Sequence, residues 1–279
     1  MTKEFHRPET WSKAHQLLNR SDVHTVPLTV SPRPTALNDR DADAFVDLEK
    51  LSLQYIQIGE DNRVHIGAMT TLQDLYLSDL IKTQASGILS EAAYLSATHG
   101  LRNLASIAGT LTDPENPPDV PLVLLSLDSI VTVQKEENQI RLVALHEWMK
   151  DCNNVLLPGE VILEVSFPMH AAAKGALVRV SLTPRDKAIV AVAAVLSVEN
   201  AVCSHAGLAL AGSNPTVVRL LDAESLLRDK ALSVELFDQC ASLAEKQADP
   251  IGNYRGSVAY RTAMASVLTR RALHQAYKA

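Results

Sequence analysis

The sequence predicts an α+β fold in two parts, and two observations lead to this expectation. In the C-terminal part, three apolar runs typical of strands are followed by three stretches with a helical spacing of apolar residues. Strands that precede helices in this way form an antiparallel sheet with helices on one face. In the N-terminal part, short strand and helix patterns alternate, and a polar, Ala-rich stretch at 169–175 is the expected boundary between the two parts.

The N-terminal part is expected to open with an amphipathic helix at 9–20. Its apolar face consists of Trp11, Ala14, Leu17 and Leu18. Strands are predicted at 24–30, 44–48, 53–58 and 63–68, with a turn at 31–35. Thr70 and Thr71 then cap a short helix that runs through Leu77.

A longer helix is predicted from Ser90 to Leu104, with Ser90 as its N-cap. After this helix we expect a turn at Ala108-Gly109 and a polar loop, which leads into the apolar run 120–127. A helix, a tight turn and a polar loop in this order can present backbone N–H groups to a phosphate. Many structural loops have the same pattern, so this arrangement alone does not distinguish the two roles.

Beyond this loop, the apolar spacing predicts a hairpin, a further strand and the C-terminal elements. The hairpin pairs 130–134 with 140–143, a short helix begins at 146–148, and the next strand covers 161–167. Later strands are predicted at 176–182, 188–198 and 202–211. Helices are predicted at 216–229, 233–247 and 258–277, the first of them after a capping turn at 213–216.

Composition excludes several classes of function. A net charge of −6 and an aromatic content of 4% argue against a nucleic-acid-binding surface. No segment reaches the ~18 consecutive apolar residues of a membrane span, and the N-terminus has no apolar stretch typical of a signal peptide. Cys152, Cys203 and Cys240 are too far apart for a metal, disulfide or iron–sulfur framework. We therefore expect a cytoplasmic protein without a metal site or a membrane or nucleic-acid partner.

Several segments together resemble a known family. Residues 102–111, RNLASIAGTL, resemble the motif I-R-N-x-G-T-I-G-G-N-L, and Asp119 follows where that family has an Asp. Residues 255–261, RGSVAYR, resemble its motif R-G-S-x-x-Y-R. Further matches lie at 5–10, 64–72, 157–162, 249–251 and 270–273. In these segments the chain is similar to the FAD-binding medium subunits of molybdenum hydroxylases, the group of carbon monoxide dehydrogenase and xanthine dehydrogenase.

This resemblance implies a fold, a cofactor and partners. The fold would be a two-part FAD-binding domain of the PCMH type at 1–170, with subdomains 1–55 and 56–170, and a C-terminal α+β domain at 176–279. The chain would bind FAD and pass electrons between iron–sulfur centres of a partner and an external acceptor. The implied partners are iron–sulfur and molybdopterin subunits, and self-association as a homo-oligomer is left open. The implied cofactor-binding residues are Ser31, Arg33, Ser106, Ile107, Gly109, Thr110 and Asp119.

The first flavin loop of the family, A-G-G-T-D/N, corresponds here to residues 28–34, LTVSPRP, which contain no glycine. Glycine amides can approach the diphosphate of FAD closely, whereas Pro32 and Pro34 have no N–H to donate. Arg33 is either a cation that neutralises the diphosphate or a solvated loop residue. A second hypothesis follows, in which the chain keeps the fold, has lost FAD, and acts as an interaction or ligand-binding module.

Other residues keep a structural interpretation beside the functional one. Asp119 is either a cofactor contact or a turn carboxylate between two prolines. Arg102 and Asn103 are expected to cap a helix C-terminus rather than to bind a ligand. The segment 255–257 is expected to fix the start of the last helix rather than to form a site.

Overall fold

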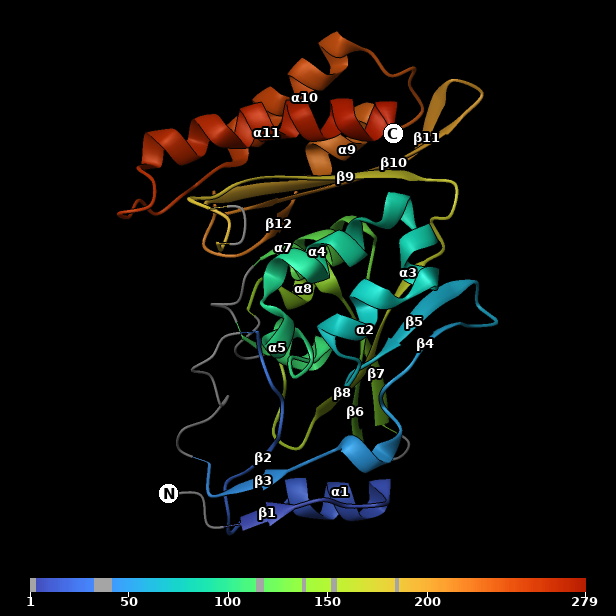
Figure 1. The fold of residues 1–279 in the computed structure, drawn as a ribbon, viewed down its shortest axis with the longest axis vertical. Helices are drawn as coiled ribbons and strands as arrows, with labels where there is room; N and C mark the ends of the chain where they lie inside the picture. The colour runs from blue at the N-terminus through green and yellow to red at the C-terminus, as the bar shows by residue number, and fades with distance from the viewer. Residues whose placement is uncertain (1–3, 33–41, 114–117, 137–138, 152–154, 184–185) are drawn as a thin grey trace. The chain divides into compact units, whose positions relative to one another are not determined.

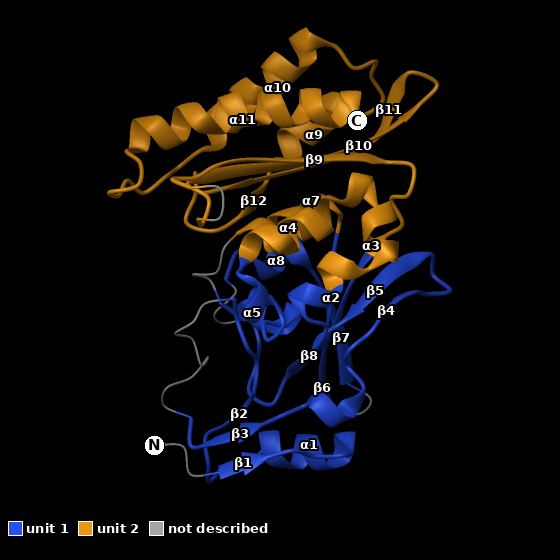
Figure 2. Ribbon diagram, in the orientation of Figure 1, with its two compact units in different colours: residues 1–74, 97–116, 129–167 blue, residues 75–96, 117–128, 168–279 orange. Residues whose placement is uncertain are grey.

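A computed structural model of the chain describes residues 4–32, 42–113, 118–136, 139–151, 155–183 and 186–279. The chain folds into two compact units that do not follow its order (Figure 2). Unit 1 contains 1–74, 97–116 and 129–167, and unit 2 contains 75–96, 117–128 and 168–279. The α+β architecture agrees with the sequence prediction. The predicted domains 1–170 and 176–279 are continuous in the sequence, whereas the two compact units are not. The domain division therefore stays a prediction.

A small parallel sheet in unit 1 is built from the N-terminal residues. Its strand order is β1 (Glu4–His6), β3 (Ala44–Val46) and β2 (Thr25–Pro27). Helix α1 (Trp11–Leu18) packs on this sheet through Ala14, Leu17 and Leu18, which confirms the predicted helix and its apolar face. The side chain of Thr10 accepts the Lys13 N–H and fixes the start of α1.

A five-stranded sheet forms the centre of unit 1. Its order is β4 (Ile56–Ile58), β5 (Arg63–Gly67), β8 (Val161–Pro168), β6 (Ile130–Glu136) and β7 (Gln139–Ala144). The predicted hairpin is confirmed, because β6 and β7 pair antiparallel from Ile130 opposite Ala144. The short helix α8 (Leu145–Trp148) follows, and the buried Trp148 indole donates to the Leu111 carbonyl at 3.0 Å. A 3₁₀ turn, η1, spans Glu49–Leu51.

The helix predicted from Ser90 to Leu104 is wrong in its start and its continuity. Helix α4 (Ile88–Ser96) begins two residues before Ser90, and the separate helix α5 (His99–Arg102) follows. Ser90 is buried within α4, and its hydroxyl donates to the Tyr76 carbonyl at 2.8 Å instead of capping a helix. The turn η2 (Ala85–Gly87) sets the start of α4, because Ser86 and Gly87 have positive φ.

The remaining helices between residues 72 and 126 are short. They are α2 (Leu72–Leu77), α3 (Asp79–Thr83), α6 (Ile107–Thr112) and α7 (Asp119–Ser126). The predicted cap of α2 is confirmed, since the Asp74 N–H donates to Thr71 Oγ1 and the Thr71 N–H donates to the Asp74 carboxylate, both at 3.0 Å. The apolar run 120–127 thus forms the buried helix α7.

Unit 2 contains a four-stranded antiparallel sheet in the order β12 (Val218–Arg219), β11 (Val202–Ala211), β10 (Val190–Glu199) and β9 (Lys174–Val180). Helices α9 (Leu221–Leu227), α10 (Val234–Gln247) and α11 (Val258–Lys278) form one core with this sheet. Figure 1 shows α10 and α11 along one face of the sheet and α4 and α7 along the other. Residues 190–196 are buried on both faces for this reason, which explains their continuous apolar run.

The predicted helix 216–229 is wrong in its first five residues. Val218 and Arg219 form β12 instead, paired with Leu210 and Ala209 of β11, and α9 begins at Leu221. The turn 213–216 therefore leads into a strand rather than capping a helix. Cys203 and Cys240 are buried in unit 2, and Cys152 lies outside the described residues. Among the described residues, no helix is both long and apolar enough to cross a bilayer.

Candidate functional site

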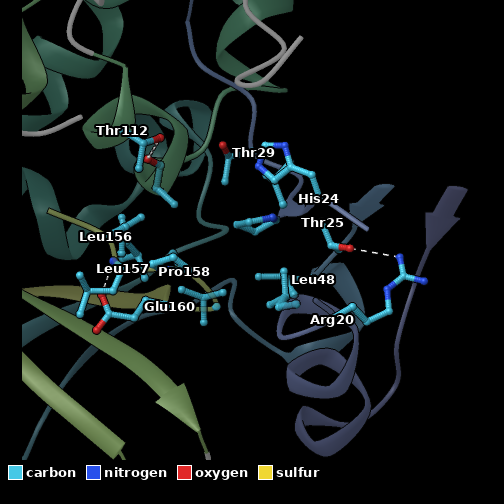
Figure 3. A pocket seen from close by; sticks show the side chains of 18 of the residues that line it. Arg20, His24, Thr25, Thr29, Leu48, Thr112, Leu156, Leu157, Pro158 and Glu160 are labelled. Carbon is cyan, nitrogen blue, oxygen red and sulfur yellow. Dashed lines mark hydrogen bonds between the residues drawn. The ribbon is translucent and has the colours of Figure 1, made fainter. Parts of the chain in front are cut away.

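Unit 1 contains a cavity of about 540 Å³, and segments that are far apart in the sequence form its walls (Figure 3). One wall comes from residues 18–29, a second from Ala68, Met69, Ala108 and Thr112, and a third from 156–162. The polar residues of the lining are Arg20, His24, Thr25, Thr29, Thr112 and Glu160. Most of the remaining wall is aliphatic. Its volume lies within the range of roughly 300–1,000 Å³ that is typical of small-molecule sites.

Helix α6 forms part of this cavity wall, and its position corrects the predicted turn at Ala108-Gly109. Both residues lie in the first turn of α6. Ser106 is the N-cap, since its hydroxyl oxygen accepts the Gly109 N–H at 3.1 Å. The Ser106 carbonyl accepts the Thr110 N–H at 2.9 Å and the Thr110 hydroxyl at 2.8 Å. This cap starts a helix at Ile107, and the sequence motif did not indicate the capping role of Ser106.

Each backbone N–H from Ser106 to Thr110 has an acceptor within the chain. The Ser106 N–H donates to the Val30 carbonyl at 2.9 Å. The N–H groups of Ile107 and Ala108 donate to the carbonyls of Thr70 and Ala68, both at 3.0 Å. The N–H groups of Gly109 and Thr110 donate to Ser106, as described above. These hydrogen bonds tie the start of α6 to the segments at 30 and 68–70.

Gly109 is required by a close approach of the backbone. A Cβ atom at this position would lie 2.1 Å from the Val30 carbonyl oxygen, which is far inside van der Waals contact. The absence of a side chain at Gly109 therefore lets α6 pack against the backbone at Val30. Ala108, in contrast, lies on the cavity wall.

The two charged residues of the lining, Arg20 and Glu160, both have partners of opposite charge. The Arg20 guanidinium lies 2.7 Å from the Glu4 carboxylate, and it donates to the Thr25 hydroxyl at 3.1 Å. Glu160 accepts two hydrogen bonds from Arg141, at 2.8 and 2.6 Å. This guanidinium holds the pKa of the Glu160 carboxyl below its usual range. The cavity wall thus carries charges that are already compensated.

Asp119 lies in unit 2, as the first residue of α7, and it is completely buried. It forms an ion pair with Arg179 of β9, at 3.3 Å from the guanidinium Nε. Burial raises the pKa of Asp119, and the Arg179 charge offsets this only in part. The residue is therefore part of a helix rather than of a turn between prolines, and neither carboxylate oxygen has a hydrogen-bond partner among the described residues.

The other predicted site residues are distributed as follows. Ser31 is completely buried in unit 1, and Arg33 lies outside the described residues. Arg102 is buried, and its guanidinium donates to the Ala97 carbonyl just after α4. Asn103 caps α5 by donating to the His99 carbonyl, so both residues have the structural roles that we expected. Within the described ranges, no three His, Cys, Asp or Glu side chains are grouped so that they could hold a metal ion.

Comparison with known proteins identifies the family. The family model for the FAD-binding domain in molybdopterin dehydrogenase matches residues 1–170, which is more than half of the chain. The chain belongs to this family. A second family model, for the C-terminal domain of the carbon monoxide dehydrogenase flavoprotein, matches residues 183–276.

Relatives of this FAD-binding family match most of the chain. The alpha subunit of the 6-hydroxypseudooxynicotine dehydrogenase complex of Paenarthrobacter nicotinovorans is 32% identical over 218 residues, covering 77% of this chain and 73% of the relative. The carbon monoxide dehydrogenase medium chain of Hydrogenophaga pseudoflava is 27% identical over 279 residues, covering 98% and 96%. A solved structure of that organism's enzyme, lacking the Mo-pyranopterin moiety of the molybdenum cofactor, has a TM-score of 0.87 at 27% identity and covers 100% of this chain and 98% of its own.

The family name implies FAD as a cofactor. The cavity and the backbone of residues 106–110 differ in how well they suit the parts of FAD. The aliphatic cavity suits a ring system in both size and polarity. The backbone of residues 106–110 does not suit a diphosphate, because all five N–H groups already have acceptors. The cavity therefore has room for a ring system, whereas the backbone N–H groups of residues 106–110 are already engaged within the chain.

The third cavity wall, at 156–162, was missed as part of a site by the sequence analysis. A signal was present, because 157–162 matches a segment of the family motif. In the sequence that match indicates the family and does not indicate a cavity wall. Thr25 and Leu48 also line the cavity. No motif in the sequence pointed to them, since both come from short stretches of ordinary composition.

Proposed function

We propose that this chain is the flavin-carrying medium subunit of a molybdenum hydroxylase complex. In this role it passes electrons between iron–sulfur centres of a partner and an external acceptor. The observation that carries the proposal is the cavity of unit 1, which is lined by α6 and the segment 24–29. These adjoin the segment that resembles the family's second flavin loop and the one that stands in place of its first. Similarity over 98% of the chain to a carbon monoxide dehydrogenase medium chain supports it.

When bound, the flavin supplies the redox chemistry, and the chain supplies binding, orientation and exclusion of water. The contacts that the family motif suggests are Ser31, Arg33, Ser106, Ile107, Gly109, Thr110 and Asp119. Those that the structure describes lie outside the cavity lining, and Ala108 and Thr112 are the residues of α6 that line it.

The partners that we propose are an iron–sulfur subunit and a molybdopterin subunit, in the cytoplasm. A tagged chain purified from its host tests this. We expect it to retain iron and molybdenum in stoichiometric amounts, together with flavin absorbance near ~450 nm, which is a property of the flavin itself. Isolation of the chain alone or as a homo-oligomer, without metals and without colour, would contradict the proposal.

A second candidate function is favoured by the hydrogen bonds of residues 106–110. In this alternative the flavin loops are degenerate, and the chain is a flavin-free subunit that acts as an interaction or ligand-binding module. Each lost amide contact to a charged phosphate forfeits roughly 1.5–3 kcal/mol, and two lost contacts weaken binding by several powers of ten. Calorimetric titration with FAD separates the two functions: a dissociation constant in the micromolar range or below eliminates the flavin-free alternative.

A further inference from the structure

Five ionisable side chains lie together at the C-terminal end of α7. They are Asp128, His170, His205, Arg219 and Glu224, and all five belong to unit 2 (Figure 2). The Arg219 guanidinium donates to the Asp128 carboxylate and, at 2.7 Å, to that of Glu224. Nε2 of His205 lies 3.5 Å from the Asp128 carboxylate, and the ring centroids of His205 and His170 are 5.0 Å apart. Two imidazole rings are thus joined through one carboxylate to a guanidinium that already has a second acidic partner.

The ring of His170 is fixed by the backbone on both sides of it. His170 is buried, its N–H donates to the Gln84 side chain at 2.8 Å, and its carbonyl accepts the Ala85 N–H at 3.0 Å. Its Nε2 lies 3.3 Å from the Leu127 carbonyl, which can only accept, so Nε2 carries a proton. The neutral ring therefore satisfies a carbonyl at the end of α7, and a second proton would have to bind at Nδ1.

The same cluster joins α7 to the sheet. Asp128 follows α7 with a φ of 58°, His205 belongs to β11, and Arg219 belongs to β12. Helix α7 packs on β10, β11 and β12 of this sheet. Near the cluster, a Cβ at Gly207 would lie 1.9 Å from the Ser126 carbonyl oxygen, so the last turn of α7 lies directly on β11. The cluster therefore lies where the end of α7 is held on the sheet.

Acid adds a charge to His205 at a place where two cations are already close. The charged groups around its ring that the structure describes are Asp128, Arg219 and Arg228. Burial lowers the pKa of His205, and the two guanidinium groups act in the same direction. Asp128 offsets this only in part, because Arg219 already compensates its charge. A proton on His170 as well would place two like charges about 5 Å apart.

We propose that His170 and His205, with Asp128 and Arg219, form an acid-sensitive latch that holds the end of α7 on β11 and β12. The latch is closed while the rings are neutral, and protonation of the rings opens it and loosens α7. The sign follows from linkage. A histidine whose folded pKa is lowered adds stability above its unfolded pKa of about 6.5, and this stability is lost as the pH falls through that value toward the folded pKa. The latch involves no cofactor, so it does not depend on the proposed function.

Hydrogen exchange of the full chain at pH 7.5 and pH 5.5, corrected for the intrinsic rate at each pH, tests the latch. We expect the protection of residues 119–128, relative to that of α11, to fall by about tenfold at pH 5.5. This is the change that one additional bound proton causes over one pH unit below about 6.5. A relative change of less than about threefold would overturn the inference.

Three variants assign the acid sensitivity to the rings. His205→Gln and His170→Gln each remove one ring, and we expect each to reduce the acid-induced loss of α7 protection to less than about threefold. His99→Gln is the matched control, because the His99 ring contacts Asn103 of unit 1, and it should keep the tenfold loss. A tenfold loss that persists in both ring variants would show that other groups sense the pH, and the inference would fall.

An NMR titration of the histidine rings in the wild-type chain gives a second readout that needs no variant to fold. We expect the His205 ring to titrate below about 6.5, the value of an unperturbed histidine, over the same pH range in which α7 loses protection. A His205 ring that titrates at or above this value would bind its proton more tightly in the folded chain, and the latch would then close in acid. That result overturns the inference.

Discussion

At Gly109 the backbone of α6 lies against the Val30 carbonyl, and no side chain fits between them. The same glycine belongs to the motif that resembles a flavin loop. Two explanations for a glycine at this position, ligand approach and packing, can be separated by experiment. The packing explanation predicts a loss of stability that does not depend on any ligand.

We expect Gly109→Ala to lower the free energy of unfolding by about 1–3 kcal/mol, the usual cost of overpacking. The clash is with a backbone oxygen, and it outweighs the gain of about 1 kcal/mol that alanine brings to a helix. Urea unfolding of the ligand-free chain measures the effect. Gly100→Ala is the control, since Gly100 of α5 has no atom within 4 Å of its Cβ position, and it should be neutral or stabilising. Equal stability of the two variants would contradict the packing explanation.

A second prediction at this scale concerns His65, which lies between two carboxylates. Its Nε2 is 3.0 Å from Asp61, and its Nδ1 is 2.9 Å from Glu164. Burial alone would lower the pKa of His65, but the hydrogen bonds to these carboxylates outweigh burial and raise it. A histidine whose folded pKa is raised adds stability below its unfolded pKa, and this stability is lost as the pH rises through the folded pKa.

We therefore expect the unfolding free energy of the wild type, relative to His65→Gln, to be greater at pH 5.5 than at pH 8.5. The difference should reach up to about 1 kcal/mol, the range for partly exposed ion pairs. Denaturant unfolding of both proteins at the two pH values provides the measurement. His99→Gln is the control, because the His99 ring contacts Asn103 rather than a carboxylate. A pH-independent difference for His65→Gln would show that the carboxylates do not stabilise its protonated form.

At the scale of elements, Arg261 links α11 to the ends of β10 and β11. Its guanidinium donates to the carbonyls of Ile189 and Gly212, both at 2.7 Å. It also donates to the Asn253 side chain at 3.0 Å, and Ser257 caps α11 by accepting the Tyr260 N–H. The R-G-S-x-x-Y-R motif that carries the family resemblance is therefore a structural device at the start of α11, as the sequence led us to expect of 255–257.

Arg261→Met should lower the free energy of unfolding by about 1–3 kcal/mol, because two carbonyl groups are left without donors. Methionine retains most of the aliphatic volume, so the change isolates the hydrogen bonds. Thermal or urea unfolding measures it. Arg271→Met on the same helix should change stability by less than about 0.5 kcal/mol, since Arg271 is exposed. A loss of similar size in both variants would mean that helix charge, and not these hydrogen bonds, is responsible.

At the scale of the whole molecule, unit 2 takes helices α3, α4 and α7 from the first half of the chain. Helix α7 packs on β10 and β11, and a Cβ at Gly207 of β11 would lie 1.9 Å from the Ser126 carbonyl oxygen. Helix α4 contacts β9. The sheet of residues 174–219 therefore depends on residues 75–96 and 117–128 for one of its two faces.

A fragment of residues 168–279 should consequently fail to fold on its own. Without α4 and α7 it would expose the apolar face that contains Ala191, Ala193 and Val195, and exposed patches of this kind promote association. We expect the fragment to bind a hydrophobic dye and to aggregate, whereas the full chain unfolds cooperatively. A monomeric fragment with a cooperative transition would contradict this, and it would support the sequence division at 176–279.

Much of the fold could be predicted because it is encoded locally. The apolar residues of β11 and α11 indicate a strand and a helix, and the hydroxyl of Ser257 marks the start of α11. The predictions failed where a contact distant in the chain decided the outcome. Ser90 bonds Tyr76 instead of capping a helix, and Val218 pairs with Leu210 before α9 can begin.

The candidate site was predictable only in part for the same reason. The sequence by itself determined the α+β class and the family, and it predicted the segment 106–110 as part of the site. Only the tertiary structure decided that the N–H groups of Ser106, Ile107 and Ala108 have acceptors at Val30, Thr70 and Ala68. It alone also shows that residues 156–162 line the cavity. Periodicity and motifs record what each residue favours along the chain, whereas hydrogen-bond partners and cavities depend on distances between residues that are far apart in it.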